Sequence, residues 1–417
     1  MYVKAESPSI QQQIDEAKPG DSLELQEGKY EENIIINKPI HLIGLEDVML
    51  TQEKFSPVIT IRSEDVTIEN VHIRHLDESG ESPAILVNSD HNSLQDIEVH
   101  TNSYGIQLDE ANHNQLSSIR IIGDKEEEIK NRKHGIDLWK SNNNKIGDTT
   151  IQHVQDGIYV ERSHANNIYD NNISKSRYGI HLMFTTNNEL TNNESYNNVS
   201  GLYVMGAEGT VVKQNVLRNN QTNVQSLGLF LFDTTSAIVT ENKIVNNRIG
   251  IFIEDATEND IMLNQIQGNY TGVQIKEAED NNISYNAFVA NVAQGQAKES
   301  THNHTNENYW GDHFGLDITG DKKSDLAYKL NPFFVNITDD YPPFQILFQS
   351  PGMIFLEQLI STPTQEQLVD ASPLMKDPLA VNKSASVNSL SILLFCIILV
   401  ICSLFIIYLG VKKNEKN

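Results

Sequence analysis

The sequence predicts an all-β fold, a right-handed parallel β-helix, and a repeated phrase is the main observation behind this prediction. The phrase occurs in forms such as GIDL, GIHL and GIFI, and from Gly135 to Gly272 its glycines are 22 residues apart in every step but one. The first and third residues after each glycine are apolar, whereas the second and fourth vary, as in a strand with one buried face. A repeat of this length fits a coil of three short strands, with coils ~4.8 Å apart. Parallel crossovers are right-handed, and the chain has room for roughly eleven or twelve coils.

Asparagines recur at fixed positions and predict the corners of the coils. They stand nine and fourteen residues after the glycine, as Asn188 and Asn193 do after Gly179. Asparagine tolerates the left-handed backbone of a sharp corner, and amides stacked at the strand spacing can hydrogen-bond from coil to coil. An α-solenoid is excluded, because no unit carries an apolar stripe of helical period.

Two longer steps interrupt the period just before a repeat glycine. The 30-residue step before Gly135 contains DKEEEIKNRK, and the 27-residue step before Gly228 contains NNQTNVQSL. Insertions confined to one edge of a solenoid often mark a binding face. They are equally typical of tolerated surface loops, so both interpretations stay open.

Charge and cysteine content exclude some functions. The chain has 56 acidic and 31 basic residues, a formal net charge of −25, which disfavours nucleic acid and suits metal cations or basic protein surfaces. Cys396 and Cys402 both lie in the C-terminal apolar run. The rest of the chain therefore has no disulfide and no thiolate metal site.

The solenoid needs closing at both ends, and the sequence offers candidates for this. Ile10 and Ile14 fall on one face of a short amphipathic helix near the N-terminus, which we expect to cap the first coil. At the other end we expect four bulky aromatic residues to close the core: Trp310, Phe314, Phe333 and Phe334.

We divide the chain into six parts on these grounds. They are an N-terminal cap and first strand (1–30), the parallel β-helix (31–300), a C-terminal cap and docking segment (301–360), a linker (361–388), a transmembrane helix (389–411) and a cytoplasmic tail (412–417).

The apolar run near the C-terminus predicts a membrane anchor. Residues 390–409 are uncharged, and as a helix they would span ~30 Å, one hydrocarbon core. Lys412 and Lys413 follow, so we expect a single-pass protein of the cell membrane with a cytoplasmic C-terminus and an extracytoplasmic β-helix. The start MYVKAESPSI lacks the apolar region of a signal peptide. We therefore expect this sequence to begin downstream of the natural start; the alternative is a cytoplasmic β-helix on a tail anchor.

Enzymes on parallel β-helices commonly act on acidic polysaccharides with clustered carboxylates or basic groups. Outward charged residues are present, but they are scattered over different coils: Asp109, Asp137, Glu161, Arg162, Arg177, Asp233 and Glu254. We interpret them as solvated, which disfavours an enzyme of this kind. A cell-surface lyase, hydrolase or epimerase acting on polysaccharide is the alternative.

Two adjacent coils, GIHLMF and GLYVMG, carry the strongest metal-binding signal. Met183 and Met205 are 22 residues apart and should stack, with His181 on the same face. Two thioethers and an imidazole suit Cu(I), a soft ion. An exposed patch of methionine beside Phe184 and Phe232 is also typical of a protein-docking surface. A second, weaker metal candidate is the set His302, His304 and His313.

The chain resembles the NosD family, the β-helix subunit of the apparatus that matures the copper sites of nitrous oxide reductase. The resemblance rests on the repeat, the coil GIHLMFTTNNEL, the segment NYWGDHFGLDITGD and the tail FQSPGMIFLEQL. It implies a non-enzymatic extracytoplasmic protein docked on the permease and ATPase of an ABC transporter. That protein would receive copper from a lipoprotein chaperone and serve nitrous oxide reductase.

The resemblance also carries the copper role, as transient Cu(I), to His181, Met183 and Met205 as candidates. In the tail we expect four residues to dock on the transporter: Phe348, Met353, Phe355 and Leu356. The sequence departs from the family in two respects, because it shows no signal peptide and adds a C-terminal transmembrane helix.

Overall fold

The computed structural model describes residues 9–52, 56–77, 80–330, 337, 341, 343, 344 and 368–380. The chain divides into two units, Met1–Pro378 and Leu379–Asn417, and the solenoid belongs to the first. No helix in the described part of the chain is long and apolar enough to cross a membrane. The predicted transmembrane helix (389–411) and tail (412–417) lie outside the described residues.

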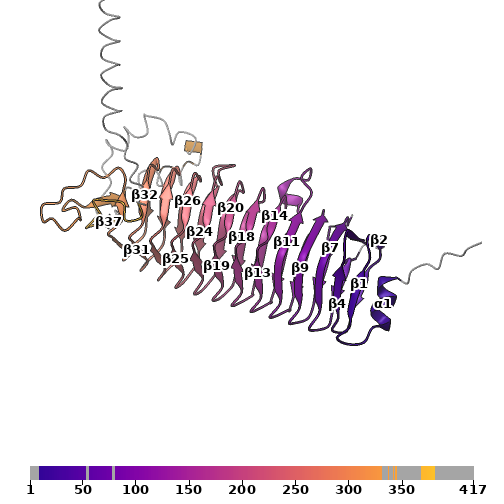
Figure 1. Ribbon diagram of the computed structural model, residues 1–417. Helices are drawn as coiled ribbons and strands as arrows, with labels where there is room; N and C mark the ends of the chain where they lie inside the picture. Colours follow the sequence, from indigo (N-terminus) through magenta and orange to yellow (C-terminus); the bar gives the residue numbers. More distant parts are fainter. Residues whose placement is uncertain are drawn as a thin grey trace, which may run out of the picture. The chain divides into compact units, whose positions relative to one another are not determined.

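A parallel β-solenoid of the right-handed type makes up most of the described chain, as the repeat predicts. Its coils stack in sequence order from the indigo end, where α1 lies, to the orange end (Figure 1). Each coil contributes one strand to a twelve-stranded sheet, here called sheet B, and two strands or one long strand to a 23-stranded sheet, here called sheet A. The described residues form twelve complete coils, and β34 and β35 begin another.

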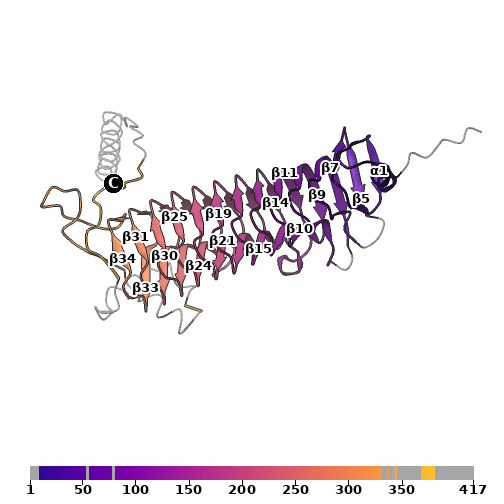
Figure 2. The same cartoon turned by 90° about the horizontal axis from the view of Figure 1, so that it is seen from below.

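Sheet B has the following strands: β3 Ile34–Ile36, β6 Ile59–Ile61, β8 Pro83–Val87, β10 Tyr104–Asp109, β12 Ile136–Trp139, β15 Asp156–Glu161, β18 Tyr178–Met183, β21 Ser200–Met205, β24 Leu227–Phe232, β27 Ile249–Glu254, β30 Thr271–Lys276 and β33 Ala293–Lys298. Seen from below, its strands run side by side along one face (Figure 2).

The strands of sheet A stack in two rows. The first row is β1 Ser22–Leu25, β4 His41–Gly44, β7 Thr67–His75, β9 Ser93–Thr101, β11 Gln115–Ile122, β13 Lys145–Gly147, β16 Asn167–Tyr169, β19 Glu189–Thr191, β22 Val211–Lys213, β25 Ile238–Thr240, β28 Asp260–Met262, β31 Asn282–Ser284 and β34 His304–Asn306. The second row is β2 Gly28–Glu31, β5 Val48–Thr51, β14 Thr150–Gln152, β17 Asn172–Ser174, β20 Glu194–Tyr196, β23 Val216–Arg218, β26 Lys243–Val245, β29 Gln265–Gln267, β32 Ala287–Val289 and β35 Tyr309–Trp310. The long strands β7 and β11 pair with both rows, and the long strand β9 pairs with β7 and β11.

The recurring glycine has a steric cause. A Cβ on Gly179 would lie 2.0 Å from Ser195 Oγ and 2.5 Å from the carbonyl oxygen of Gly201 on the next coil. Neither distance is possible for a real side chain, so this coil can enter sheet B at position 179 only with a residue that lacks Cβ. The two apolar residues that follow, Ile180 and Leu182, are fully buried, as the alternation predicts.

Buried asparagines form ladders along the corners. Asn193 Nδ2 donates to Asn215 Oδ1 (3.0 Å) and to the carbonyl oxygen of Ile168 (2.8 Å), while Asn193 Oδ1 accepts the backbone N–H of Asn171. The stacked amides are therefore confirmed. The left-handed residue, however, is the one before the ladder asparagine: Asn192 has φ +56°, and Asn193 is not left-handed.

The N-terminal helix α1 (Ile10–Glu16) forms where it was predicted. Ser9 caps its first turn by accepting the N–H of Gln12, and Ile10 and Ile14 are buried in the core cluster. The helix contacts β1 and β3 of the first coil. Its capping role stays a prediction.

At the C-terminal end, Trp310 is buried and stacks between Phe288 and Tyr328, with ring centroids 4.4 and 4.5 Å away. Its indole N–H donates to Asp370 Oδ2 (3.0 Å). The expectation for Phe314 is wrong, because this residue is 93% exposed. Phe333 and Phe334 lie outside the described residues.

Part of the predicted linker is ordered into a strand. Residues of β37 (Leu368–Asp370) pair in antiparallel fashion with β36 (Tyr328–Leu330). Asp370 is fully buried and accepts the backbone N–H groups of Glu307 and Asn308. This short strand is therefore held on the last coil, and the division that assigns 361–388 to a linker stays a prediction.

Candidate functional site

The outward face of sheet B carries the predicted methionine pair. Met183 ends β18 and Met205 ends β21, and the two residues are direct Cα partners in the parallel ladder. His181, two residues before Met183, points to the same face because side chains alternate along a strand. The predicted stacking of the two methionines is confirmed. Both methionines are half-buried.

His181 is enclosed, and one of its two nitrogens is occupied. Its side chain lies among the rings of Tyr159, Tyr178 and Tyr203, with centroids 5.0 to 5.4 Å away. Nδ1 lies 3.0 Å from Asp156 Oδ2, whereas Nε2 is buried and finds no hydrogen-bond partner among the described residues. A carboxylate on Nδ1 fixes the proton there and leaves the lone pair of Nε2 free, as in histidine metal ligands.

Asp156 anchors this arrangement and has no exposed side-chain surface. Arg177 donates to it in a fork, Nε to Oδ1 at 2.8 Å and Nη2 to Oδ2 at 2.7 Å. Burial alone would raise the pKa of Asp156, but the hydrogen bonds from His181 and Arg177 lower it to about 2. The carboxylate therefore stays charged at any physiological pH.

His134, on the neighbouring coil, completes the surroundings of Asp156. Its Nδ1 lies 3.7 Å from Asp156 Oδ2, and its ring stacks on Tyr159 with centroids 4.5 Å apart. Burial lowers the pKa of His134 to about 4. His134 is thus neutral at physiological pH, and Arg177 supplies the lasting positive charge beside Asp156.

An acidic group lies on the other side of Tyr159. The Tyr159 hydroxyl donates to Glu161 Oε2 at 2.7 Å, and its oxygen is 3.4 Å from Met183 Sδ. Asp137, buried one coil earlier, accepts a hydrogen bond from Gln107 (3.1 Å). Burial, reinforced by Glu161 and Asp109, raises the pKa of Asp137 to about 7. Near neutral pH this carboxyl group is partly protonated.

Sequence reasoning missed most of this cluster. It treated Asp137, Glu161 and Arg177 as scattered, yet the coils bring all three around Tyr159 and Asp156. Asp156 and His134 each stand one residue before a repeat glycine, a position that also faces outward. Aligning that position along the repeat would have shown the row Tyr104, His134, Asp156, Tyr178.

The second histidine set is not brought together. His302 and His304 are exposed at the last coil, while His313 Nε2 lies 3.1 Å from Ser324 Oγ and 3.0 Å from the carbonyl oxygen of Leu326. Among the described residues, no three His, Cys, Asp or Glu side chains already stand at the separations of metal ligands. The predicted docking residues Phe348, Met353, Phe355 and Leu356 lie outside the described residues.

A cavity of about 420 Å³ adjoins the candidate site on the C-terminal side. Tyr203, Phe230 and Phe252 line its floor, and Val224 and Gln225 of the 27-residue step line its wall. Val224 is 45% exposed. One of the two insertions therefore lies beside the candidate site, while its role as a binding edge stays a prediction.

Residues 118–315 match the sequence model of a family described as periplasmic copper-binding protein (NosD). These coils are of the NosD family. The match includes His181, Met183 and Met205 and all of the Asp156 cluster, and it confirms the resemblance stated from the sequence. The description of that family names copper and the periplasm. No curated protein matches the chain.

Solved structures confirm the parallel β-helix fold of this chain. The family 28 exopolygalacturonase of Yersinia enterocolitica superposes with a TM-score of 0.54 at 12% identity, covering 70% of this chain and 74% of that one. A mannuronic acid specific family 6 polysaccharide lyase from human gut microbiota gives a TM-score of 0.52 at 12% identity, covering 72% and 84%. At such identities the likeness concerns the parallel β-helix alone.

Proposed function

We propose that this protein is a non-enzymatic, extracytoplasmic accessory subunit that holds Cu(I) transiently and delivers it for assembly of the metal centres of nitrous oxide reductase. One observation carries the proposal. The ladder pairs Met183 with Met205 on the face where His181 keeps a buried nitrogen without a hydrogen bond. The family description, periplasmic copper-binding protein, supports the same metal.

The donor set fits Cu(I) better than other biological cations. Thioether sulfur and neutral imidazole are soft or borderline ligands, and neither must lose a proton at neutral pH. Asp156 holds His181 by Nδ1, which presents Nε2 as the ligand atom. Three ligands leave one side of the ion open, so that another protein can take it.

The surroundings of the methionines suit a transient protein contact. Phe184 follows Met183 and is 49% exposed, and Phe232 is the ladder partner of Met205. Exposed apolar side chains beside polar ones mark interaction surfaces. We propose that a lipoprotein copper chaperone docks here to load the site.

The membrane partners are proposed from the sequence. Residues 389–411 would anchor the chain in the cell membrane, with the β-helix extracytoplasmic, and residues 341–360 would dock on the permease of an ABC transporter driven by its ATPase. Deleting 341–360 should then release the transporter and leave the chain in the membrane. If the transporter still co-purified with the chain after the deletion, the docking surface would have to lie elsewhere.

The copper site is tested by replacing both methionines with leucine. Leucine keeps the volume and the apolar character, so the fold should survive. For Met183→Leu/Met205→Leu we expect the affinity for Cu(I), measured without oxygen against a competing chelator, to fall at least about tenfold. Thermal unfolding should be nearly unchanged.

The matched control is Met262→Leu, which removes a half-buried thioether from β28 in sheet A. We expect this variant to bind Cu(I) like the wild type. If the double variant also binds like the wild type, the methionines are not ligands and the proposed copper site is wrong.

A polysaccharide-active enzyme is the second candidate, favoured by one observation. Sheet B carries Asp137, Tyr159 and Glu161 on its outward face, and Arg177 stands just before its strand β18. A carboxyl group with a pKa of about 7, as at Asp137, can act as an acid or a base. Incubation with polygalacturonate or alginate tests it. New reducing ends, unsaturated products or epimerised residues that vanish in Asp137→Asn would favour the enzyme, and none should form if the protein only handles copper.

A further inference from the structure

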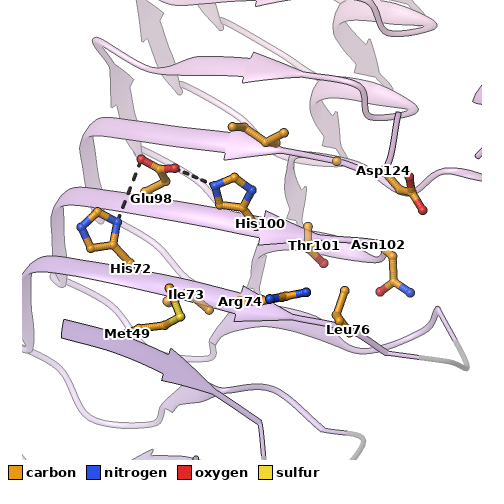
Figure 3. A pocket seen from close by; sticks show the side chains of 12 residues that line it. Met49, His72, Ile73, Arg74, Leu76, Glu98, His100, Thr101, Asn102 and Asp124 are labelled. Atoms are coloured by element: carbon orange, nitrogen blue, oxygen red, sulfur yellow. Dashed lines mark hydrogen bonds and ion pairs between the residues drawn. The ribbon is translucent and has the colours of Figure 1, made fainter. Parts of the chain in front are cut away.

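A second concave region lies on the outward face of sheet A, far along the chain from the methionines. It is a cavity of about 490 Å³, lined by side chains of β5, β7, β9 and β11 and of the turns that follow β7, β9 and β11. Figure 3 shows His72, Glu98 and His100 at one end of it and Asp124 at the other. No part of the proposed copper site contributes to it.

Two imidazoles flank one carboxylate in this cavity. Glu98 Oε1 lies 2.6 Å from His100 Nε2, and Glu98 Oε2 lies 4.0 Å from His72 Nδ1. The dashed lines in Figure 3 mark both pairs. His72 and Glu98 are direct ladder partners on β7 and β9, and His100 follows Glu98 by two residues on the same face. The sequence therefore places two nitrogen ligands and one oxygen ligand on neighbouring positions of one sheet surface.

We propose that His72, Glu98 and His100 form a binding site for a divalent transition-metal ion such as Zn²⁺ or Cu²⁺. Two histidines and one glutamate are a known ligand set for such ions, and a fourth position stays open to water. Imidazole and carboxylate favour these divalent ions over the soft Cu(I).

The ion would replace the direct contacts between Glu98 and the two imidazoles. The three side chains are not yet gathered around one point, and among the described residues no three such side chains are. Side chains on directly paired and diagonal sheet positions are within reach of each other. The side chains of His72, Glu98 and His100 are 41, 33 and 51% exposed, so they can turn toward a common ion without disturbing the core.

The charges around the cavity determine whether it favours a cation. Arg74, the ladder partner of His100, opposes a cation, whereas Glu98 and Asp124 favour one, and the whole chain carries a net charge of −25. Met49 is the ladder partner of His72 on the other side and is 39% exposed. Its thioether offers a weak fourth ligand if the ion is copper.

The inference goes beyond the proposed function. The three ligands lie before residue 118, outside the family match, and on the sheet opposite the methionine pair. The site at His72, Glu98 and His100 offers hard and borderline ligands, whereas the methionine pair offers soft ones. One chain could therefore hold Cu²⁺ and Cu(I) at separate sites.

The test titrates the full chain with Zn²⁺ alone against a competing chelator. We expect one ion to bind, and His72→Gln, Glu98→Gln and His100→Gln each to weaken binding by about tenfold or more. All three positions are on the surface, so the variants should fold. The control is His91→Gln: His91 is an exposed histidine stacked on His113 at 5.0 Å between centroids, and its loss should leave Zn²⁺ affinity unchanged.

Met183→Leu/Met205→Leu separates the two proposals. We expect this double variant to keep the Zn²⁺ affinity of the wild type whether or not it loses Cu(I). Wild-type Zn²⁺ affinity in both His72→Gln and His100→Gln would overturn the divalent site, as would an equal loss in His91→Gln.

Discussion

Two buried aspartates on one face of sheet B show how the surroundings of a residue set its charge. Asp156 receives a guanidinium fork and an imidazole and keeps a pKa of about 2. Asp137 receives one amide hydrogen bond from Gln107 and faces other carboxylates, and burial raises its pKa to about 7. Paired charge offsets desolvation at Asp156 and is missing at Asp137. Asp156 therefore suits the fixed task of orienting His181.

The raised pKa of Asp137 predicts a stability that falls as pH rises. Its ordinary value is 3.8 and its folded value about 7, so between these values the folded protein holds a proton that the unfolded chain has lost. The free energy of unfolding then decreases from pH 3.8 to about 7 and levels off above it. The effect has an upper limit of about 4 kcal/mol.

Asp137→Asn should remove this pH dependence, because an amide stays neutral and its oxygen can still accept the hydrogen bond from Gln107. We expect the variant to gain stability relative to the wild type between pH 5 and pH 8, measured as the difference in thermal unfolding midpoint. A constant difference across that range would mean that Asp137 is already ionised at pH 5.

Individual coils are held at their corners by amide ladders. Asn193 is fully buried, donates to two carbonyl oxygens on neighbouring coils and accepts from the backbone and the side chain of Asn171. Each coil thus satisfies polar groups of the coil before and the coil after it. A third ladder, from Asn198 to Asn220 and Asn247, repeats the pattern nineteen residues after the glycine.

Asn193→Ala should leave several of these buried groups without partners. We expect a loss of roughly 2–4 kcal/mol in unfolding free energy, since each unsatisfied buried group costs about 1–3 kcal/mol. Asn306→Ala is the control, because Asn306 is exposed in β34. Both losses are measured by urea unfolding. Equal losses in the two variants would mean that the asparagine ladder does not stabilise the fold.

The elements could be predicted from the sequence where the repeat is strict. The positions of Ile180, Leu182 and Met205 could be predicted from the alternation of apolar residues and the constant period. In a solenoid each residue pairs with the residue one period later, so the period determines the strand register. Asp156 could not be recognised in this way, since its partners Arg177 and His181 stand 21 and 25 residues away and only the coil geometry brings them together. Phe314 was misplaced for a related reason: it lies beyond the last repeat, where no periodicity tells inside from outside.

The whole solenoid depends on an unbroken apolar core from Ile10 to Trp310. Each coil contacts mainly the coil before and the coil after it. The free energy of unfolding therefore depends on the contacts between adjacent coils. A break in a middle coil should separate the two halves, whereas a break at an end should only shorten the solenoid. The candidate copper site lies on middle coils, and it therefore depends on this continuity.

Ile180→Asp tests the continuity of the core. Ile180 is fully buried between its ladder partners Ile158 and Leu202, and an unpaired carboxylate there would have no water and no counter-charge. We expect a loss of at least about 4 kcal/mol. Hydrogen exchange should show protection lost first around residues 158–202 and retained near Ile34 and Phe288. Thr191→Asp, on the outward side of β19, should change neither measurement. Wild-type protection of these coils in the Ile180 variant would mean that residue 180 faces outward. The register that pairs Met183 with Met205 would then be wrong as well.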